Sequence, residues 1–424
     1  MSAPTVTPGT SARPRLPNWA GFALTIAMVW LTGQFVTQGL SDHFLGDDPE
    51  MSVLLRGDSS DAVGALARKR LVTRDNDGAA RLAGRALRLD PLNASALTTV
   101  GFAEDQLGRP GPANAAMSVA GELGWRDVLT QVWLFRRDLL AHDYAGALDH
   151  GDAVMRREEV TPQIVLAVLA AAARDPAAIA PLERHLAANP AWRLPFFSFL
   201  CLNARPPATD LARTLLFHLA LGPTPPTVDE QAVFLRRLVG DRQFDAAAAA
   251  WRVLRPKAAA AGLVYDGDFE TPAGPSPFDW YMTQAAGWEA ALADSPEGRG
   301  HALRVDYDGV SPPQTLRQML ILPPGRYRLS GRADVESGTA PGSLGWSIDC
   351  ATTSDVFARI DTPATASGAW APFSVELNIP PARCPAEWLE LTTDAGDMRK
   401  DLVIWYDDLA VTPLPQPASG VQNP

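Results

Sequence analysis

The chain has 424 residues, more than one ordinary domain, so two or three folded units are expected. Hydrophobic residues make up 46% and charged residues 20% of the sequence, which excludes wholesale disorder, and a mean hydropathy of −0.05 excludes a polytopic membrane protein. The net charge of −11 excludes nucleic acid as a partner, because phosphate binding needs a basic surface.

The first element is an apolar run at residues 18–40, which contains no charged residue. About 20 helical residues cross a hydrocarbon core of roughly 30 Å, so the run predicts one transmembrane helix. Arg13 and Arg15 precede it, and acidic residues follow it: Asp42, Asp47, Asp48 and Glu50. The positive flank predicts a cytoplasmic tail at residues 1–17, with the bulk of the chain in the periplasm and the helix in a bacterial inner membrane. The alternative is a cleaved signal peptide, which has a similar pattern.

A linker is expected at residues 41–60, followed by a helical region at residues 61–258 that is rich in Ala, Leu and Arg. Ala79, Ala113 and Ala147 lie 34 residues apart, an interval typical of helix-turn-helix repeats. With small residues at the helix crossings, this region resembles the tetratricopeptide repeat family. The resemblance implies four or five helix pairs stacked into an α-helical solenoid, with residues 174–226 matching poorly.

The inner groove of such a solenoid usually binds a peptide or a protein, so the resemblance implies a protein partner. By repeat position, four residues face that groove: Phe102, Asp105, Gln106 and Arg136. The alternative is that these are ordinary solvated helix residues.

Short alternating segments between Gly, Pro and Asp clusters fill residues 263–413, for example HALRVDY, LGWSIDC and EWLELTT. Seven or more such segments over about 150 residues predict an antiparallel β-sandwich, and a jelly roll is its expected form. Residues 414–424 are expected to form a disordered tail.

The sandwich opens with DGDFE at residues 266–270 and closes with IWYDDL at residues 404–409. These motifs resemble the carbohydrate-binding modules of the cellulase and xylanase type, which imply a jelly roll and a polysaccharide ligand. The resemblance also implies a structural calcium ion, with Glu270 and Asp408 as ligands and Asp268 as a further ligand. Asp266 replaces the family's usual Asn, and the alternative is that these acids cap turns without a metal.

A sugar platform needs a flat aromatic ring, and the adjacent Trp280 and Tyr281 point to opposite faces if the segment is extended. Trp280, Tyr281 and Trp288 are therefore the candidate glycan-binding residues, with core packing as the alternative. Between residues 263 and 412 the sequence has twenty-two acidic and ten basic residues, which disfavours a strongly anionic glycan.

Cys350 and Cys384 flank strands of one small domain, so a disulfide between them is expected in an oxidising compartment. Cys201 is expected to be a buried free thiol. The usual catalytic motifs are absent, among them G-x-S-x-G and H-E-x-x-H, so no enzyme is expected.

The sequence thus predicts a membrane-anchored periplasmic adaptor that binds a protein through its helices and a glycan through its jelly roll. Exopolysaccharide or envelope assembly is the process in which such an adaptor is expected. Two alternatives remain: a structural scaffold without sugar binding, and a glycosidase that uses a carboxylate pair such as Asp306 and Asp308.

Overall fold

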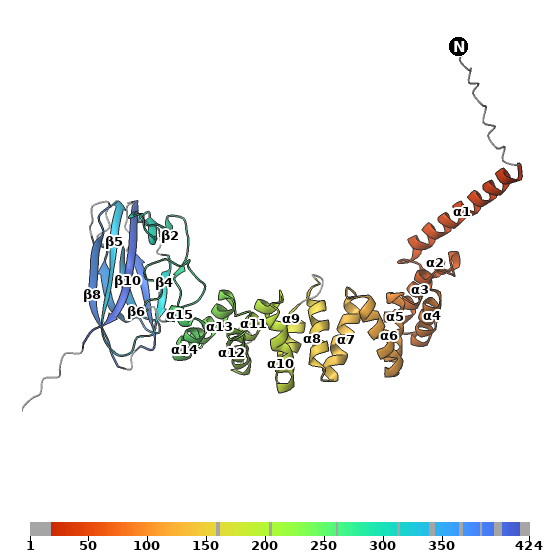
Figure 1. The fold of residues 1–424 in the computed structure, drawn as a ribbon, viewed down its shortest axis with the longest axis horizontal. Coiled ribbons are helices and arrows are strands. Elements are labelled where there is room, and N and C mark those ends of the chain that lie inside the picture. Colours follow the sequence, from red (N-terminus) through yellow and green to blue (C-terminus); the bar gives the residue numbers. More distant parts are fainter. Residues whose placement is uncertain are drawn as a thin grey trace, which may run out of the picture. The chain divides into compact units, whose positions relative to one another are not determined.

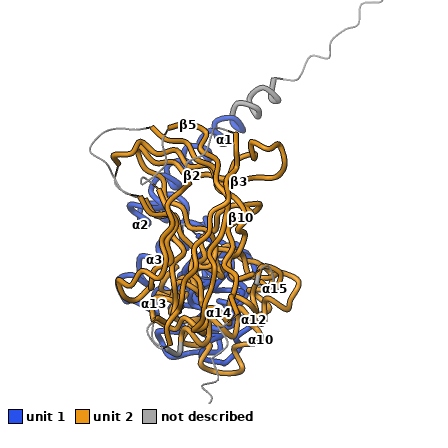
Figure 2. The backbone as a smooth tube through the Cα atoms, turned by 90° about the vertical axis from the view of Figure 1, so that its left-hand side faces the viewer, with its two compact units in different colours: residues 1–161 blue, residues 162–424 orange. Residues whose placement is uncertain are grey.

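The structure is a computed structural model. It describes residues 18–157, 162–202, 206–259, 262–311, 314–338, 344–363, 368–381, 384–393 and 401–415, and the side chains of residues 18–25, 206, 207 and 259 lie outside this description. The chain forms two compact units, residues 1–161 and residues 162–424, which are shown in different colours in Figure 2. The predicted tail at residues 1–17 and most of the tail at residues 414–424 lie outside the described residues.

The N-terminal helix α1 (Asn18–Phe44) is followed by α2 (Pro49–Leu55) (Figure 1). The linker predicted at residues 41–60 is therefore wrong. The Asp48 side chain accepts a hydrogen bond from the Met51 amide, and Pro49 occupies the first helical turn, so this polar stretch starts a helix. Within the described part of the chain, no helix meets the length and apolarity that a membrane span requires.

The remaining helices of the first unit are arranged in pairs along the sequence. The first helix of each pair begins at residue 60, 94 or 128, at intervals of 34 residues, as the alanine spacing predicts. Ala79, Ala113 and Ala147 are all buried. The bounds are α3 (Ser60–Val72), α4 (Asn76–Leu89), α5 (Ala94–Gln106), α6 (Pro110–Leu123), α7 (Val128–Leu140) and α8 (Tyr144–Met155).

The second unit begins with seven helices among its described residues. Residues 174–226 are mostly helical, but the interval changes there, because α11 begins 31 residues after α9 and α13 begins 35 residues after α11. From α3 to α14 the described chain holds six helix pairs, where four or five were predicted. The bounds are α9 (Pro162–Ala172), α10 (Pro176–Ala187), α11 (Arg193–Leu202), α12 (Pro206–Ala220), α13 (Val228–Gly240), α14 (Phe244–Leu254) and α15 (Pro256–Ala259).

An antiparallel β-sandwich of two five-stranded sheets completes the second unit (Figure 1). Sheet A has the strand order β1 (Tyr281–Met282), β4 (Leu316–Leu320), β9 (Glu387–Thr393), β6 (Leu344–Cys350) and β7 (Val356–Asp361). Sheet B has the order β2 (Trp288–Asp294), β3 (His301–Tyr307), β10 (Leu402–Pro413), β5 (Gly325–Ser337) and β8 (Ala371–Ile379). The predicted helical N-terminal region and C-terminal sandwich are thus confirmed.

The last helix pair and the sandwich meet through a small mixed interface. The Trp251 ring of α14 lies 5.4 Å from the Phe278 ring and 5.8 Å from the Tyr265 ring. Beside these rings, the Arg255 Nη1 atom lies 2.7 Å from the Asp279 Oδ1 atom, and the Asp279 side chain is 3% exposed. A buried ion pair, an edge-to-face ring contact and a tilted ring contact therefore join the sandwich to the helices within this unit.

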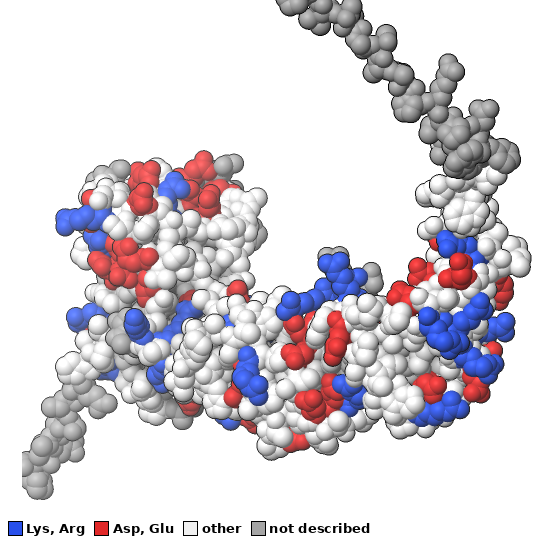
Figure 3. All heavy atoms as spheres, turned by 45° about the vertical axis from the view of Figure 1, so that its right-hand side comes forward, with Lys and Arg blue, Asp and Glu red and all other residues white. Residues whose placement is uncertain are grey.

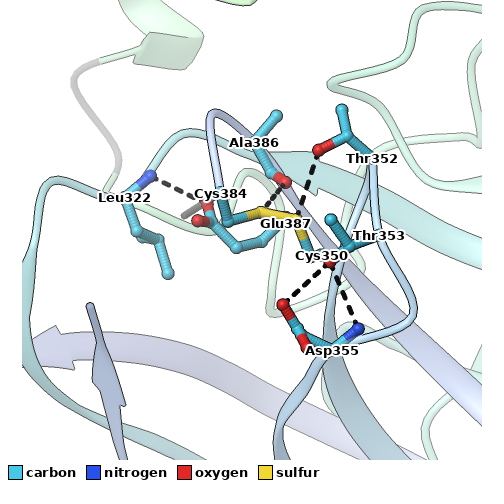
Figure 4. The surroundings of a disulfide bond; sticks show 8 residues. All are labelled: Leu322, Cys350, Thr352, Thr353, Asp355, Cys384, Ala386 and Glu387. Atoms are coloured by element: carbon cyan, nitrogen blue, oxygen red, sulfur yellow. Dashed lines mark hydrogen bonds between the residues drawn. A yellow bond between two sulfur atoms is a disulfide. The ribbon is translucent and has the colours of Figure 1, made fainter. Parts of the chain in front are cut away.

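The expected disulfide between Cys350 and Cys384 is present, with 5.7 Å between the two Cα atoms (Figure 4). It joins the end of β6 to the segment that precedes β9. Cys201 is a buried free thiol, as expected. Glu387, the first residue of β9, lies beside the disulfide and is fully buried.

Glu387 makes the stability of the fold depend on pH. Its Oε2 atom accepts a hydrogen bond from the Leu322 amide at 3.0 Å, and its buried Oε1 atom has no partner. Burial raises the pKa of Glu387 from 4.5 to about 7. The folded chain therefore holds this proton to a higher pH than the unfolded chain, so the contribution of Glu387 to stability is complete below pH 4.5 and is lost as the pH rises from 4.5 through 7.

Between pH 4.5 and pH 8, we expect the free energy of unfolding to fall by about 3 kcal/mol more in the wild type than in Glu387→Gln. Glutamine keeps an acceptor for the Leu322 amide but does not titrate. Urea unfolding of both proteins across this range measures the difference. Asp266, whose pKa burial raises to about 6, leaves a residual slope of the same sign in the variant. Equal slopes in the two proteins contradict the prediction.

Candidate functional site

Two of the three predicted glycan-binding aromatics lie in the core. Trp280 is 2% exposed and Trp288 is 1% exposed, so neither ring is available to a sugar, and their assignment to a platform is wrong. The Trp280 ring packs against Phe269 and Trp346. Tyr281 is 43% exposed, because adjacent residues of an extended strand point to opposite faces.

Tyr281 begins a line of side chains that crosses all five strands of sheet A on the face away from the core. Cross-strand pairing joins Tyr281 to Arg317, Arg317 to Glu390, Glu390 to Ser347, and Ser347 to Arg359. We call these five residues the outer row. With about 4.8 Å between neighbouring strands, it is about 19 Å long.

The second aromatic of this face is Trp388, the next residue after Glu387 in β9. The Arg317 guanidinium lies 4.0 Å from the centre of the Trp388 ring. Trp388 also pairs across the sheet with Asp349, whose Oδ2 atom accepts a hydrogen bond from the Ser347 hydroxyl at 2.5 Å. The other carboxylate oxygen of Asp349 is buried and has no hydrogen-bond partner. The face therefore combines aromatic rings and a guanidinium group with a pair of polar side chains, the buried Ser347 and the half-buried Asp349.

Two carboxyl groups of this face have raised pKa values. Burial raises the pKa of Asp349, while the Ser347 hydroxyl and the Arg359 charge lower it. Burial also raises the pKa of Glu390. The Arg317 charge lowers this pKa, and the Asp349 charge raises it. Both groups thus lie closer to their neutral forms than free carboxyls, and they suit hydrogen bonding to uncharged hydroxyl groups.

The opening motif at residues 266–270 has a structural role at the end of the sandwich. The buried Asp266 accepts hydrogen bonds from the amides of Glu270 and Thr271 at 3.1 and 2.9 Å. Its carbonyl accepts one from the Trp280 indole at 2.8 Å. A Cβ atom on Gly267 would lie 1.8 Å from the Leu409 carbonyl oxygen, so only glycine fits where the motif meets β10. The motif therefore closes the sandwich by tying its first segment to its last strand.

Two of the three predicted calcium ligands, Glu270 and Asp408, contact a His or Arg side chain. Glu270 accepts hydrogen bonds from the His301 amide at 3.0 Å and interacts with His301 Nδ1 at 3.1 Å. The Asp408 Oδ2 atom lies 2.8 Å from the Arg332 Nε atom. Among the described residues, no three or more His, Cys, Asp or Glu side chains gather in a way that suits a metal. The contacts of Glu270 and Asp408 favour the alternative in which these acids hold no metal.

From this arrangement we expect calcium to leave the stability of the chain unchanged. The measurement compares the melting temperature in 5 mM calcium, on the order of a weak extracellular site, with that in EDTA. Magnesium at the same concentration controls for ionic strength. A rise of several degrees that is specific to calcium contradicts this expectation and restores the sequence-based assignment.

The predicted protein-binding residues lie on α5 and α7. Asp105 accepts hydrogen bonds from the Trp133 indole at 3.2 Å and from Arg136 at 3.1 Å. Phe102 packs against the cluster of Met117, Trp133 and Leu134, and Gln106 is exposed. The structure thus joins Asp105 and Arg136 on one surface, whereas Phe102 takes part in packing. The spacing of the repeats did not point to Trp133.

Sequence reasoning also missed most of the outer row. The alternation in EWLELTT places Trp388 and Glu390 on the face opposite Leu389 and Leu391, and this signal was available. Arg317, Ser347 and Arg359 join them only through the strand order of sheet A.

No protein-family model and no curated protein matches this chain. Solved structures that are similar to it include a CBM4 carbohydrate-binding module, with 17% identity, 36% of this chain and 99% of that chain covered, and a TM-score of 0.28. The CBM22-1 xylan-binding domain from Paenibacillus barcinonensis is 12% identical, with 35% of this chain and 93% of that chain covered and a TM-score of 0.26. A family 16 carbohydrate-binding module is 15% identical, with 36% of this chain and 99% of that chain covered and a TM-score of 0.26.

Proposed function

We propose that this chain is a membrane-anchored periplasmic adaptor of a bacterium that binds an uncharged glycan on the outer row of sheet A. The observation that carries the proposal is the outer row itself, in which Tyr281 and the neighbouring Trp388 lie beside the guanidinium group of Arg317 and the carboxyl group of Glu390. Aromatic rings pack against the apolar face of a pyranose, and polar groups pair with its hydroxyls. The chain binds this glycan without cleaving it.

The charge of the sandwich supports an uncharged ligand. Residues 263–412 hold twenty-two acidic and ten basic residues, so an anionic polymer is repelled at long range. Arg317 and Arg359 are the basic members of the outer row, and Arg317 already lies over Trp388. Neutral hydroxyl groups match such a mixed surface better than carboxylates or sulfates do.

The helix pairs are the protein-binding part of this adaptor, and we assign them to tetratricopeptide-type repeats. Support comes from the 34-residue intervals of α3, α5 and α7. Asp105 and Arg136 offer an ion pair that a partner polypeptide can reach, since the Arg136 side chain is 61% exposed. Exopolysaccharide or envelope assembly is the process that we propose for such a protein.

The proposed anchor is the apolar run at residues 18–40. From residue 26 onward, the large apolar side chains of α1 are strongly exposed on all sides, and water does not favour such a surface. They include Ile26, Met28, Val29, Trp30, Leu31, Phe35, Val36 and Leu40.

Glycan binding is tested with the full chain in detergent on an array of neutral and anionic polysaccharides. We expect binding to a neutral polysaccharide and about tenfold weaker binding for Tyr281→Ala and for Trp388→Ala, because each variant removes one stacking surface. Arg359→Ala removes a hydrogen-bond donor of the same row and is expected to weaken binding less.

The matched control is Trp370→Ala. Trp370 is a half-buried tryptophan that stacks on Arg332 of sheet B, at 4.5 Å, and it does not belong to the outer row. We expect it to bind like the wild type. Unchanged affinity of Tyr281→Ala and Trp388→Ala contradicts the site, and the absence of binding to any polysaccharide leaves the structural scaffold as the function.

A further inference from the structure

The two cysteines of the disulfide differ in exposure. Cys350, at the end of β6, is 4% exposed, whereas Cys384, in the segment before β9, is half-buried. An external thiol therefore reaches Cys384 more easily than Cys350. Because attack of a thiolate on one sulfur of a disulfide expels the other, the departing sulfur is that of the buried Cys350.

A buried sulfur does not leave easily as a thiolate. Burial disfavours the charged form of a thiol, as it does at Cys201, where burial raises the pKa to about 11. The Cys350 sulfur therefore needs a neighbouring group that stabilises or protonates it. The Thr352 hydroxyl, 3.5 Å from the Cys350 Sγ atom, is a weak group of this kind. A protonated carboxyl group is a stronger one, and Glu387 provides it.

Glu387 lies directly opposite Cys350 on the neighbouring strand. The register of β6 and β9 pairs these two residues, so their side chains point to the same face of sheet A, with Cβ atoms about 4.5–5.5 Å apart. Figure 4 shows the Glu387 side chain beside the two sulfur atoms. Its Oε2 atom accepts from the Leu322 amide, whereas its buried Oε1 atom has no hydrogen-bond partner. In the protonated acid, Oε1 is the oxygen that can carry the proton and donate it.

Few groups act on the Glu387 carboxyl. Burial raises its pKa to about 7, and the Leu322 amide lowers it. Tyr327 of β5 also faces it, and burial and the Glu387 charge raise the pKa of this tyrosine above 10. Tyr327 thus stays neutral near pH 7, and its hydroxyl donates to the Pro323 carbonyl at 2.6 Å. The Glu387 proton is therefore present below about pH 7 and absent well above it.

The charge of the sandwich bears on which thiols reach this bond. Acidic side chains gather on the face of the sandwich that Figure 3 shows, and residues 263–412 hold twenty-two acidic and ten basic residues. A negatively charged thiol is repelled by such a surface at long range. A thiol that is uncharged, or that lies on a basic surface, is the better reactant.

We propose that the Cys350–Cys384 bond exchanges with an external dithiol, and that Glu387 donates a proton to the departing Cys350 sulfur. A thiolate of the dithiol attacks the Cys384 sulfur, the S–S bond breaks, and the Cys350 sulfur takes the Glu387 proton. The second thiolate of the reductant then attacks its own sulfur in the mixed disulfide and releases Cys384. The reductant loses two electrons and becomes a disulfide, the protein gains them as two thiols, and water returns the proton to Glu387. This exchange does not depend on glycan binding.

The test follows the reduction of the full chain in detergent by dithiothreitol between about pH 5.5 and pH 9. Each rate is divided by the concentration of dithiothreitol thiolate, which removes the pH dependence of the reagent. We expect this normalised rate to fall at least about tenfold in the wild type as the pH rises through 7, and to stay flat in Glu387→Gln. The matched control is Asp266→Asn, which removes another buried carboxyl, with a pKa raised to about 6, and keeps the wild-type profile.

The site of attack is read separately with 2-mercaptoethanol, an uncharged thiol, followed by N-ethylmaleimide and mass spectrometry. We expect mercaptoethanol on Cys384 and maleimide on Cys350. The reverse distribution overturns the proposal, as does a Glu387→Gln profile that keeps the wild-type fall. A rate that is independent of the dithiothreitol concentration also overturns it, because reduction then follows unfolding. If Glu387→Gln does not fold, the wild-type profile and the site of attack decide, and a flat wild-type profile contradicts proton donation.

Discussion

Arg193→Met is expected to lower the free energy of unfolding of the second unit by about 3–5 kcal/mol. Arg193 and Glu230 are each 2% exposed, with paired contacts of 2.7 and 2.9 Å. The guanidinium also donates to backbone carbonyl oxygens of Leu186, Thr224 and Pro225. Loss of the arginine leaves the buried Glu230 carboxylate without its counter-charge and removes one donor from each of three carbonyl groups. Urea unfolding followed by circular dichroism measures the loss.

The control is Arg213→Met, which removes an ion pair with Asp210 in which both side chains are more than half exposed. Its expected cost is less than about 1 kcal/mol, because water screens such a pair. Arg193→Met combined with Glu230→Leu is expected to recover part of the lost stability, since no uncompensated buried charge remains. If Arg193→Met costs no more than Arg213→Met, the buried pair does not stabilise the irregular α11–α13 region.

Replacement of both Cys350 and Cys384 by alanine is expected to cost about 3–4 kcal/mol. The disulfide closes a loop with a sequence separation of 34 residues, and the open chain gains conformational entropy when unfolded. Reduction of the wild type is expected to give the same loss, measured by urea unfolding with and without a reductant. Cys201→Ala is the control, because it removes a buried thiol that forms no disulfide.

The disulfide is also expected to affect glycan binding. The bond lies next to β9, which carries Trp388 and Glu390, so the reduced protein is expected to bind glycan more weakly than the oxidised one. A reduced protein that is as stable as the oxidised one contradicts the role of the disulfide in the sandwich.

Local sequence patterns predicted most elements of the fold. HALRVDY and EWLELTT coincide with β3 and β9, because alternation reports burial directly. The 34-residue interval predicted α3 to α8 because each repeat position meets the same neighbours. It failed for α11 and α12, where the interval shortens, and for α2, which is a short capped helix in a polar stretch.

The site was less predictable because it depends on pairing between strands far apart in the chain. Alternation showed that Trp280 and Tyr281 face opposite ways, but it did not show which one faces the core. The fully buried Trp346 and Phe269 rings receive Trp280, so only Tyr281 remains outside. Likewise, the strand order β1-β4-β9-β6-β7 brings Arg317 beside Glu390.

The opening motif at residues 266–270 suggested two roles, closure of the sandwich and calcium binding. Asp266 and Gly267 still tie the opening segment to β10, as the backbone contacts require. Glu270 and Asp408 contact His301 and Arg332. The motif thus coincides with the closure of the sandwich, and calcium binding stays a prediction.

The most direct test of the central claim is carbene footprinting of the full chain with and without the neutral polysaccharide that it binds. Protection is expected at Tyr281, Trp388 and Arg359, with no change at Trp370, which contacts Arg332 of the other sheet. Protection at Trp370 or on the helices, with Tyr281 and Trp388 still labelled, contradicts glycan binding by the outer row.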